Sequence, residues 1–256
     1  MSYDHETAHA VLDEALVCHV GFVVEGRPVV LPHLHVRLGE VLYLHGSTGA
    51  RAMQAARGDG LEVCVTATLL DGLVLARSAF NHSVNYRSVV VHGTAAVVQD
   101  QQEKTAALAA LVEAVAPGRT GGTRPPSRSE LAATTVLRVD LHEVSVKVRT
   151  GPPDDDPEDL GLPYWAGVLP LITSPGTPQP TDDLPAVVAV PEHVSAWKRP
   201  APRSRSSSGS SCGIGHVDRC KRLTDLVGAS RPPNAAPPSS PNPSSTQRLS
   251  LPTVRR

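Results

Sequence analysis

Long apolar runs are missing from this chain of 256 residues. None approaches the roughly 20 consecutive apolar residues that a helix needs to cross a bilayer. The first residues, Met1 to Glu6, also lack the basic start of a secretion signal. We therefore expect a cytoplasmic protein with no membrane partner.

The fingerprints of several common enzyme folds are missing as well. No G-x-G-x-x-G follows a strand-like run, because Gly213-Ile214-Gly215 continues differently, and there is neither a P-loop nor a G-x-S-x-G elbow. A built-in dinucleotide-binding domain is thereby excluded.

Cysteine is scarce, with four residues in the whole chain. Cys18 and Cys64 fall in apolar strand-like runs, where a reduced cysteine usually behaves as a small core residue. Cys212 and Cys220 flank His216, but these three donors fall short of the four ligands of a structural zinc site. We therefore expect no metal site.

Aromatic residues make up 3% of the chain and are absent from residues 199–256. This segment has ten Lys or Arg against two Asp, and serine and proline fill 21 of its positions. Since such a segment cannot bury enough apolar surface to offset the entropy of ordering it, we predict a disordered tail. The net charge of −1 leaves −9 for residues 1–198, which argues against a nucleic-acid partner.

Apolar periodicity is present up to about residue 151, and a Pro- and acid-rich arm follows over residues 152–198. The periodicity predicts helices over 5–17, 50–57 and 100–116 and a capping box at Ser127 and Glu130. It predicts strands over 20–25, 28–37, 40–45, 61–69, 72–78, 86–98 and 135–149, with a hairpin turn at Asp71-Gly72. Six or seven short strands with helices at the corners indicate a mainly β, small closed barrel, on which Tyr164 and Trp165 of the arm could pack.

One segment combines small, hydroxyl and basic side chains where a predicted strand passes into a helix. Ser47 and Thr48 offer hydroxyl groups, Gly49 allows a close backbone approach, and Arg51 adds a charged fork. The sequence therefore predicts a phosphate-binding turn, although an ordinary helix start with a solvated arginine is the alternative.

Three sequence runs occur together with this turn, in an order and spacing that resemble a known family. They are His45-Gly46-Ser47-Thr48-Gly49, His82-Ser83-Val84-Asn85-Tyr86-Arg87-Ser88 and Lys147-Val148-Arg149-Thr150-Gly151-Pro152-Pro153. From about Tyr3 to Val190 the chain resembles the flavin-nucleotide-binding, nitroimidazole reductase-like branch of the pyridoxamine 5'-phosphate oxidase-like superfamily. The resemblance implies an FMN-binding split β-barrel that pairs into a homodimer, with FMN in the groove between the subunits.

The resemblance also implies the site. The residues that would hold FMN are Ser47, Thr48, Gly49, Arg51, Asn85, Arg87 and Lys147, with Arg87 or Lys147 near the phosphate or the ring's O2 side. The alternative is that Arg87 and Lys147 pair with the domain's excess acids. A histidine could protonate a substrate as hydride leaves flavin N5, and His82 is the preferred catalytic candidate.

We therefore expect an oxidoreductase that passes hydride or electrons between flavin and a small organic substrate, with NAD(P)H as a transient donor. The arginine-bearing C-terminal segment of true pyridoxamine phosphate oxidases is not recognisable here, which argues against vitamin B6 oxidation. Two alternatives remain open. One is a non-catalytic flavin- or haem-binding module in which His33, His35 or His45 would ligate iron, and the other is a deazaflavin-dependent reductase, since that coenzyme also carries a phosphate.

Overall fold

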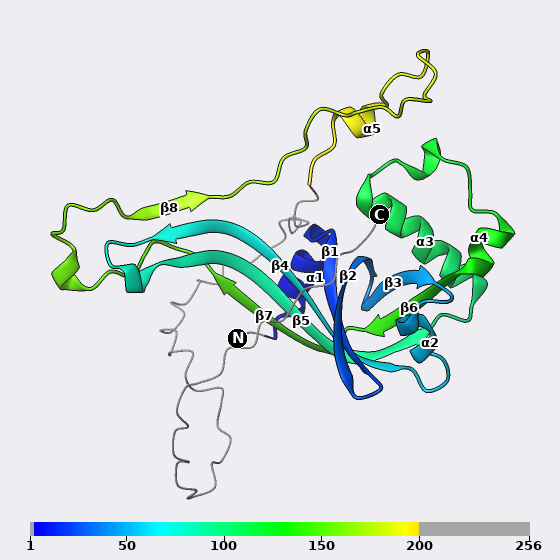
Figure 1. The fold of residues 1–256 in the computed structure, drawn as a ribbon, viewed down its shortest axis with the longest axis horizontal. Helices are drawn as coiled ribbons and strands as arrows, with labels where there is room; N and C mark the ends of the chain where they lie inside the picture. Colours follow the sequence, from blue (N-terminus) through cyan, green and yellow to red (C-terminus); the bar gives the residue numbers. More distant parts are fainter. Residues whose placement is uncertain (1–2, 200–256) are drawn as a thin grey trace, which may run out of the picture. The chain divides into compact units, whose positions relative to one another are not determined.

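The computed structural model describes residues 3–199. The helices and strands in this range, labelled in Figure 1, are α1 (His5–Glu14), β1 (Val17–Val24), β2 (Arg27–Leu38), β3 (Val41–Ser47), α2 (Arg51–Ala55), β4 (Leu61–Leu75), β5 (Ser83–Val97), α3 (Gln101–Val115), α4 (Arg128–Ala133), β6 (Thr134–Asp140), β7 (Glu143–Arg149), β8 (Gly167–Pro170) and α5 (Glu192–Ser195). Three short 3-10 turns, which the figure does not label, are η1 (Ala79–Asn81), η2 (Thr120–Gly122) and η3 (Pro157–Asp159). The predicted tail over 199–256 lies outside the described residues, apart from Arg199. No helix among residues 3–199 has both the length and the apolar character that crossing a membrane requires.

Six of the strands close into a barrel. The sheet order is β7-β5-β6-β3-β2-β1-β4-β8, and β5 also pairs with β4, so that β1, β2, β3, β6, β5 and β4 form a ring. Every pairing in this ring is antiparallel. The prediction of a mainly β barrel with short helices at its corners is therefore confirmed.

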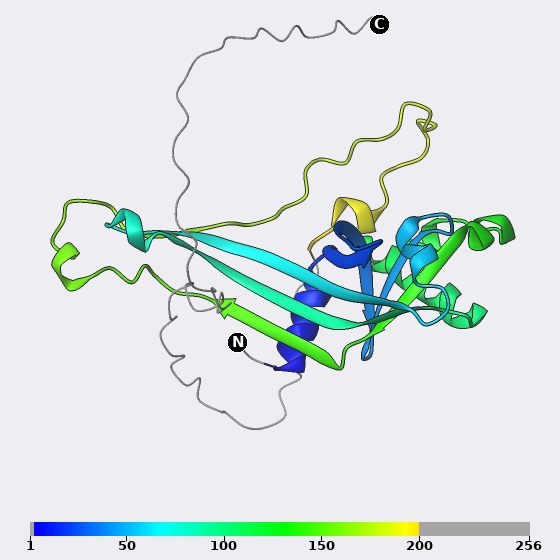
Figure 2. The same ribbon diagram turned by 60° about the horizontal axis from the view of Figure 1, so that its bottom comes forward.

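The predicted hairpin turn at Asp71-Gly72 is wrong. Residues Leu61–Leu75 form one strand, β4, which pairs with β5 along its length with a register shift between Leu70 and Gly72. Asp71 is the extra residue of a β-bulge at this shift, so the Asp-Gly pair marks an irregularity within a strand and not its end. Figure 2 shows β4 and β5 side by side as one long hairpin.

The single strand predicted over residues 135–149 is also wrong, because it is interrupted. β6 ends at Asp140, β7 begins at Glu143, and both pair with β5. Leu141 is fully buried and its N–H donates to the Glu40 carbonyl at 2.9 Å, which takes this residue out of the ladder with β5. The interruption lets the chain leave β3 and continue along β5.

Side chains and backbone groups at the helix starts explain where the helices begin. The Asp4 carboxylate accepts hydrogen bonds from Glu6 and Thr7 N–H at the start of α1, and Asp100 caps α3 in the same way. The predicted capping box at the start of α4 is confirmed, since Ser127 and Glu130 satisfy each other's backbone N–H groups.

The main core combines alternating aliphatic side chains of the strands with side chains of α1 and α2, and a smaller cluster lies between the barrel and α3. The largest fully buried side chains of the described residues are Leu42, Leu44, Met53, Leu69, Leu141, Val11, Val65, Val74, Val89, Val91, Val136 and Val139. Burying one such side chain contributes about 1.5 to 3 kcal/mol, which allows an aromatic-poor core to hold the barrel together.

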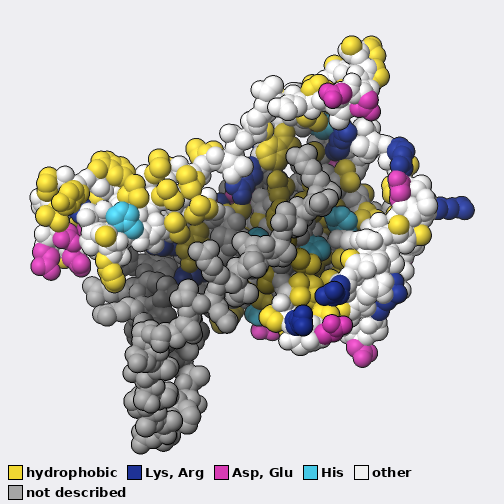
Figure 3. All heavy atoms as spheres, in the orientation of Figure 1, with side chains coloured by type: hydrophobic (Ala, Val, Ile, Leu, Met, Phe, Trp, Pro, Cys, Tyr) yellow, Lys and Arg dark blue, Asp and Glu magenta, His cyan; other side chains and the backbone are white. Residues whose placement is uncertain are grey.

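The β4–β5 hairpin extends past the barrel and carries β8 along β4. Apolar side chains stay exposed here, and Figure 3 shows them gathered over this end of the molecule. They include Leu70, Phe80, Val84, Trp165, Leu169 and Ile172. Trp165 and Tyr164 are 66% and 61% exposed, so neither packs onto the barrel within this chain.

Candidate functional site

A gap between two barrel strands forms the centre of the candidate site. β2 and β3 are paired only from His35↔Leu44 to Leu38↔Val41. β3 pairs with β6 along its whole length, so over residues 45–47 it pairs only with β6, and over residues 27–34 β2 pairs only with β1. The strands therefore separate at one end, and each presents a backbone edge that a planar ligand could approach. Leu31 and Leu34 on the β2 side are 42% and 40% exposed.

Two half-buried histidines, His33 on β2 and His45 on β3, lie at this separation. The ring of His33 hydrogen-bonds to the backbone of His45. His45 Nδ1 is buried and has no hydrogen-bond partner among the described residues. Burial lowers the pKa of both imidazoles, so each is neutral near pH 7 and keeps a lone pair.

His35, the third histidine of the predicted iron-ligand set, is held elsewhere. It is 3% exposed, and its Nε2 lies 2.9 Å from the carbonyl oxygen of Leu12 in α1. Because a carbonyl only accepts, Nε2 carries the proton, and Nδ1 is left buried without a partner in the described chain. His35 therefore joins α1 to the barrel, whereas His33 and His45 border the gap.

The predicted phosphate-binding turn continues from the β3 edge. The Thr48 N–H donates to Ala133 O at 2.9 Å, and its hydroxyl donates to Ala132 O at 3.1 Å. Since a hydroxyl has one proton, Thr48 is used to anchor the turn and has no hydroxyl donor left for an anion. Ser47 and Arg51 are exposed on either side of it. The predicted contact with a phosphate therefore depends on the side chains of Ser47 and Arg51, and Gly49 is exposed between them.

Arg87 lies in an ion-pair network and not beside this turn. It donates to Asp71 through Nε and Nη2, at 2.9 and 2.7 Å, and to Glu14 through Nη1 and Nη2. The two carboxylates raise the pKa of Arg87 above its usual range. The structure thus agrees with the alternative stated for Arg87, in which this residue pairs with acidic groups of the domain.

Asn85 and Lys147 also have contacts within the chain. Asn85 is 7% exposed, donates to Gly151 O at 3.0 Å and accepts from Arg149 at 2.8 Å, so both ends of its amide are used. The Lys147 ammonium lies 5.8 Å from the centre of the Tyr86 ring. Their predicted contact with a flavin stays a prediction.

His82, the catalytic candidate, is not brought to the phosphate turn. It follows η1 at the far end of β4, and its Nδ1 lies 3.0 Å from Ser78 O. α2, with Arg51, precedes the near end of this strand, and Figure 1 shows α2 and η1 at opposite ends of the β4–β5 hairpin. Fifteen residues of strand span about 50 Å. Within one chain, His82 and Arg51 therefore cannot contact the same small ligand.

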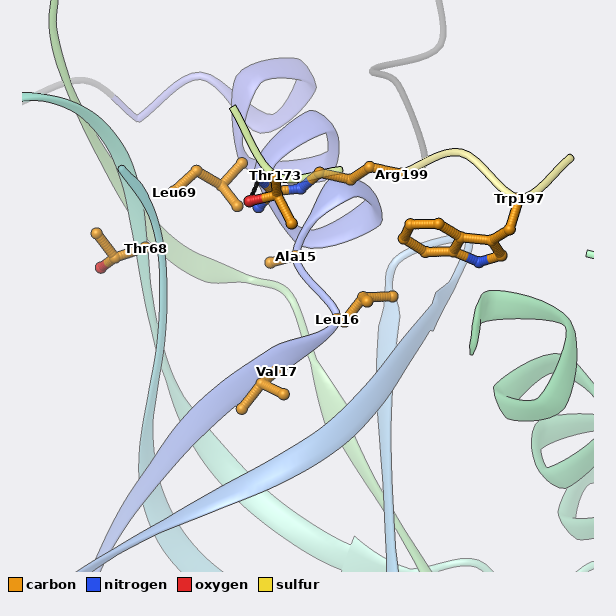
Figure 4. A pocket seen from close by; sticks show the side chains of 8 residues that line it. All are labelled: Ala15, Leu16, Val17, Thr68, Leu69, Thr173, Trp197 and Arg199. Carbon is orange, nitrogen blue, oxygen red and sulfur yellow. Dashed lines mark hydrogen bonds between the residues drawn. The ribbon is translucent and has the colours of Figure 1, made fainter. Parts of the chain in front are cut away.

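Two hollows lie near these strands. The larger, about 630 Å³, lies between the β1–β2 hairpin and the strands β4 and β5, and Cys64, His92 and Glu143 are among the residues that line it. The smaller, about 220 Å³, is shown in Figure 4, where Trp197 of the arm and Arg199, just after the arm, lie over the junction of α1 and β1.

Sequence reasoning missed the contacts at the end of the arm. The Trp197 ring donates from Nε1 to Val115 O at 2.8 Å, and Arg199 donates to Thr173 at 3.2 Å. The isolated tryptophan beyond a proline-rich stretch was the available signal, since an indole N–H usually finds a partner when it is shielded. Because the composition changes at residue 199, this signal was not recognised.

Known proteins match the chain over the gap and the turn. A family model described as pyridoxamine 5'-phosphate oxidase matches residues 4–148. The flavocytochrome Anf3 from Azotobacter vinelandii is 39% identical, with a TM-score of 0.71, and the match covers 77% of this chain and 91% of that one. The FAD and haem binding protein from Mycobacterium smegmatis is 36% identical, with a TM-score of 0.73, over 79% of this chain and 98% of that one. No curated protein matches significantly. The chain belongs to the pyridoxamine 5'-phosphate oxidase-like family of split-barrel proteins.

Proposed function

We propose that this protein binds a flavin and a haem and transfers electrons between them and a small-molecule substrate. Two related structures at 36% identity or more support this, one named a flavocytochrome and the other an FAD and haem binding protein. The observation in this chain that carries the proposal is the pair of neutral histidines in the gap between β2 and β3, one with an unpartnered buried nitrogen.

The residues at the gap fit such cofactors. A neutral imidazole nitrogen with a free lone pair can bind a haem iron or accept a hydrogen bond from a flavin ring N–H. His45 is neutral near pH 7, and its Nδ1 is buried and unpaired, which has a free-energy cost that a ligand would remove. Leu31 and Leu34 add exposed apolar side chains on the two faces of this stretch of β2, and planar cofactors bind sites that are mostly apolar.

The flavin phosphate would lie against the Ser47–Arg51 turn. The Ser47 hydroxyl can donate to a phosphate oxygen, and the Arg51 guanidinium can form a bidentate pair with it. We propose FAD in place of the FMN implied by the sequence, because the Mycobacterium smegmatis relative is named for FAD. Both flavins carry a phosphate that this turn can hold.

The chain's own groups would position the cofactors. His33 and His45 would hold their ligand at the backbone edges, and Arg51 would fix the other end. A bound flavin exchanges two electrons as hydride or one at a time, and a bound haem exchanges one, so together they supply the redox chemistry. The enzymatic role, with NAD(P)H as transient donor, is part of the proposal.

We further propose that the partner is a second copy of the chain. The β4–β5 hairpin beyond the barrel exposes Leu70, Phe80 and Val84, and Ile172 lies next to it at 85% exposure. Apolar groups gathered in this way on a soluble surface usually mark an interface. A partner would also be able to supply His82 to a site that one chain cannot complete.

The spectrum of the purified protein tests the proposal. Flavin gives two bands in the near-ultraviolet and blue and haem gives a Soret band, and mass spectrometry of the extract separates FAD, FMN and deazaflavin. His45→Gln should weaken the Soret band or the flavin bands, and His19→Gln, on β1, should change neither. Protein that lacks both chromophores after reconstitution with haemin and FAD would refute the proposed function.

A further inference from the structure

A second cluster of ligating side chains lies outside the gap, between α1 and the β2–β3 turn. His5 and His9 are four residues apart on α1, so they share one face of the helix. Glu40 lies in the two-residue turn Gly39–Glu40 and points its carboxylate at both. We propose that His5, His9 and Glu40 form a binding site for a divalent transition-metal cation of the zinc type.

The spacing of the donor atoms fits such a cation. His5 Nδ1 lies 3.4 Å and His9 Nε2 lies 3.2 Å from the Glu40 carboxylate. All three ligand atoms lie within 4.8 Å of one another. Ligands bonded to zinc at about 2.0 to 2.2 Å with tetrahedral angles are separated by roughly 3.3 Å, so small rotations of the His9 and His5 rings would complete the geometry.

The chemical types of the three donor atoms favour one class of cation. Two imidazole nitrogens and one carboxylate oxygen suit zinc and neighbouring transition metals, whereas calcium and magnesium prefer oxygen ligands throughout. The Glu40 side chain is 58% exposed, and a solvated glutamate carboxylate is ionised near pH 7. A carboxylate in this form can bind a cation directly.

Both sides of the site are held in place by other contacts. Arg37 on β2 donates to Asp13 on α1 through Nε and Nη2, at 2.9 and 2.5 Å, and to Gly39 O at 2.7 Å. The Glu40 carbonyl accepts from Leu141 N–H at 2.9 Å. The helix and the turn are therefore fixed relative to each other before any cation binds, which lowers the entropy cost of binding.

Room for the remaining ligands is available on the solvent side. The side chains of His5, His9 and Glu40 are 46%, 20% and 58% exposed. A cation bound there would keep one or more water ligands, and it would crosslink α1 to the barrel. Metal binding would therefore stabilise the fold, because the unfolded chain does not hold the three donors together.

Calorimetric titration of the full-length protein with zinc chloride, after chelator treatment and desalting, tests the proposal. The titration is done in a Cys212→Ser/Cys220→Ser background, so that the cysteines of the tail do not bind the probe. We expect one equivalent to bind and the melting temperature to rise with zinc concentration. His9→Gln and Glu40→Gln should each weaken binding by more than the roughly 10- to 100-fold that loss of an outer-shell contact causes.

His142→Gln is the matched control, because His142 is exposed and lies outside the cluster. This variant should bind zinc as the background protein does. Circular dichroism confirms folding of each variant, and Glu40→Gln keeps the test valid if a histidine variant unfolds. Zinc binding that is unchanged in Glu40→Gln, or absent in the background protein, would overturn the proposal. A loss of haem in His9→Gln would also overturn it, since the cluster would then serve the other cofactor.

Discussion

The Arg87 guanidinium holds the carboxylate of Glu14 at the end of α1, with Nη2 3.0 Å from Oε1. The Glu14 side chain is 9% exposed and that of Arg87 is 24% exposed. Arg87 therefore lets an acidic group be buried at the junction of α1 and β1, next to the apolar side chains of Ala15 and Leu16.

Replacing Arg87 should destabilise the fold more than it affects flavin binding. Arg87→Ala removes the bidentate partner of Glu14 and leaves it only Arg199, whose Nε lies 3.6 Å from Glu14 Oε1. We expect a loss of about 2 to 4 kcal/mol in the free energy of unfolding, somewhat below the value for a fully buried pair. Urea denaturation measures it. Arg57→Ala, at an exposed position, should cost less than about 0.5 kcal/mol. Equal stability of the two variants would show that the network contributes nothing.

Arg51 should matter for the flavin and not for the fold. Arg51→Ala removes an exposed guanidinium from the Ser47–Arg51 turn, and we expect it to weaken flavin binding by roughly 1.5 to 3 kcal/mol. Titration of the apo-protein with FAD and FMN gives the dissociation constants. Arg57→Ala is again the control, because it lies just beyond α2 with the same charge. An unchanged constant in Arg51→Ala would remove Arg51 from the site.

The bound flavin should accept electrons from a nicotinamide donor without a stable complex, because no dinucleotide fingerprint occurs in the chain. Under anaerobic conditions NADH or NADPH should bleach the blue flavin band, and a stopped-flow trace should show a rate that rises linearly with donor concentration. Bleaching by dithionite alone would indicate a different electron donor.

Local sequence signals predicted most of the fold. The capping residues Asp100 and Ser127 mark helix starts through contacts with their own neighbours, so one segment of sequence is enough to reveal them. The bulge at Asp71 could not be predicted in this way. Its polar side chain is accommodated within a strand by Arg87, which is distant in sequence, and a turn is the better local explanation of Asp-Gly.

The sequence predicted only part of the candidate site, because only part of the site is formed by one continuous segment. The Ser47–Arg51 turn is a continuous segment, and its shape follows from its own residues. The gap beside it depends on where β2 and β3 stop pairing. This point cannot be predicted from the sequence of either strand alone. The positions of His33 and His45 at this gap follow from pairing, and the use of the Thr48 hydroxyl follows from contact with α4.

Two glycines precede β4, and replacing each of them allows the free-energy cost of backbone strain to be compared with that of a steric clash. Gly60 has φ +93°, and a Cβ there would lie 2.5 Å from Thr94 Cγ2 and 3.2 Å from Ala95 O. Gly58 has φ +80° with nothing within 4 Å of an added Cβ. Gly58→Ala should cost about 1 kcal/mol from the left-handed backbone alone, and Gly60→Ala about 2 to 4 kcal/mol because strain and overpacking combine. Chemical denaturation compares them, and equal costs would argue against close packing of Gly60 on β5.

His35 should make the stability of the fold depend on pH. Burial lowers the pKa of His35 from 6.5, while the Leu12 carbonyl and Asp13 oppose this shift in part. Since the unfolded chain binds a proton more readily than the folded one, the contribution of His35 is complete above about pH 6.5 and is lost as the pH falls toward the folded pKa. His33 and His45 act in the same direction, so the comparison of variants isolates His35.

His35→Gln keeps a donor for Leu12 O but cannot be protonated in this range. We expect the free energy of unfolding of the wild type to fall more steeply between pH 7.5 and 5.5 than that of His35→Gln, as measured by urea titrations at about five pH values. His142→Gln, which changes an exposed imidazole, should follow the wild type. Parallel curves for wild type and His35→Gln would mean that the buried imidazole is protonated as easily in the folded barrel as in the unfolded chain, which would contradict its burial against Leu12.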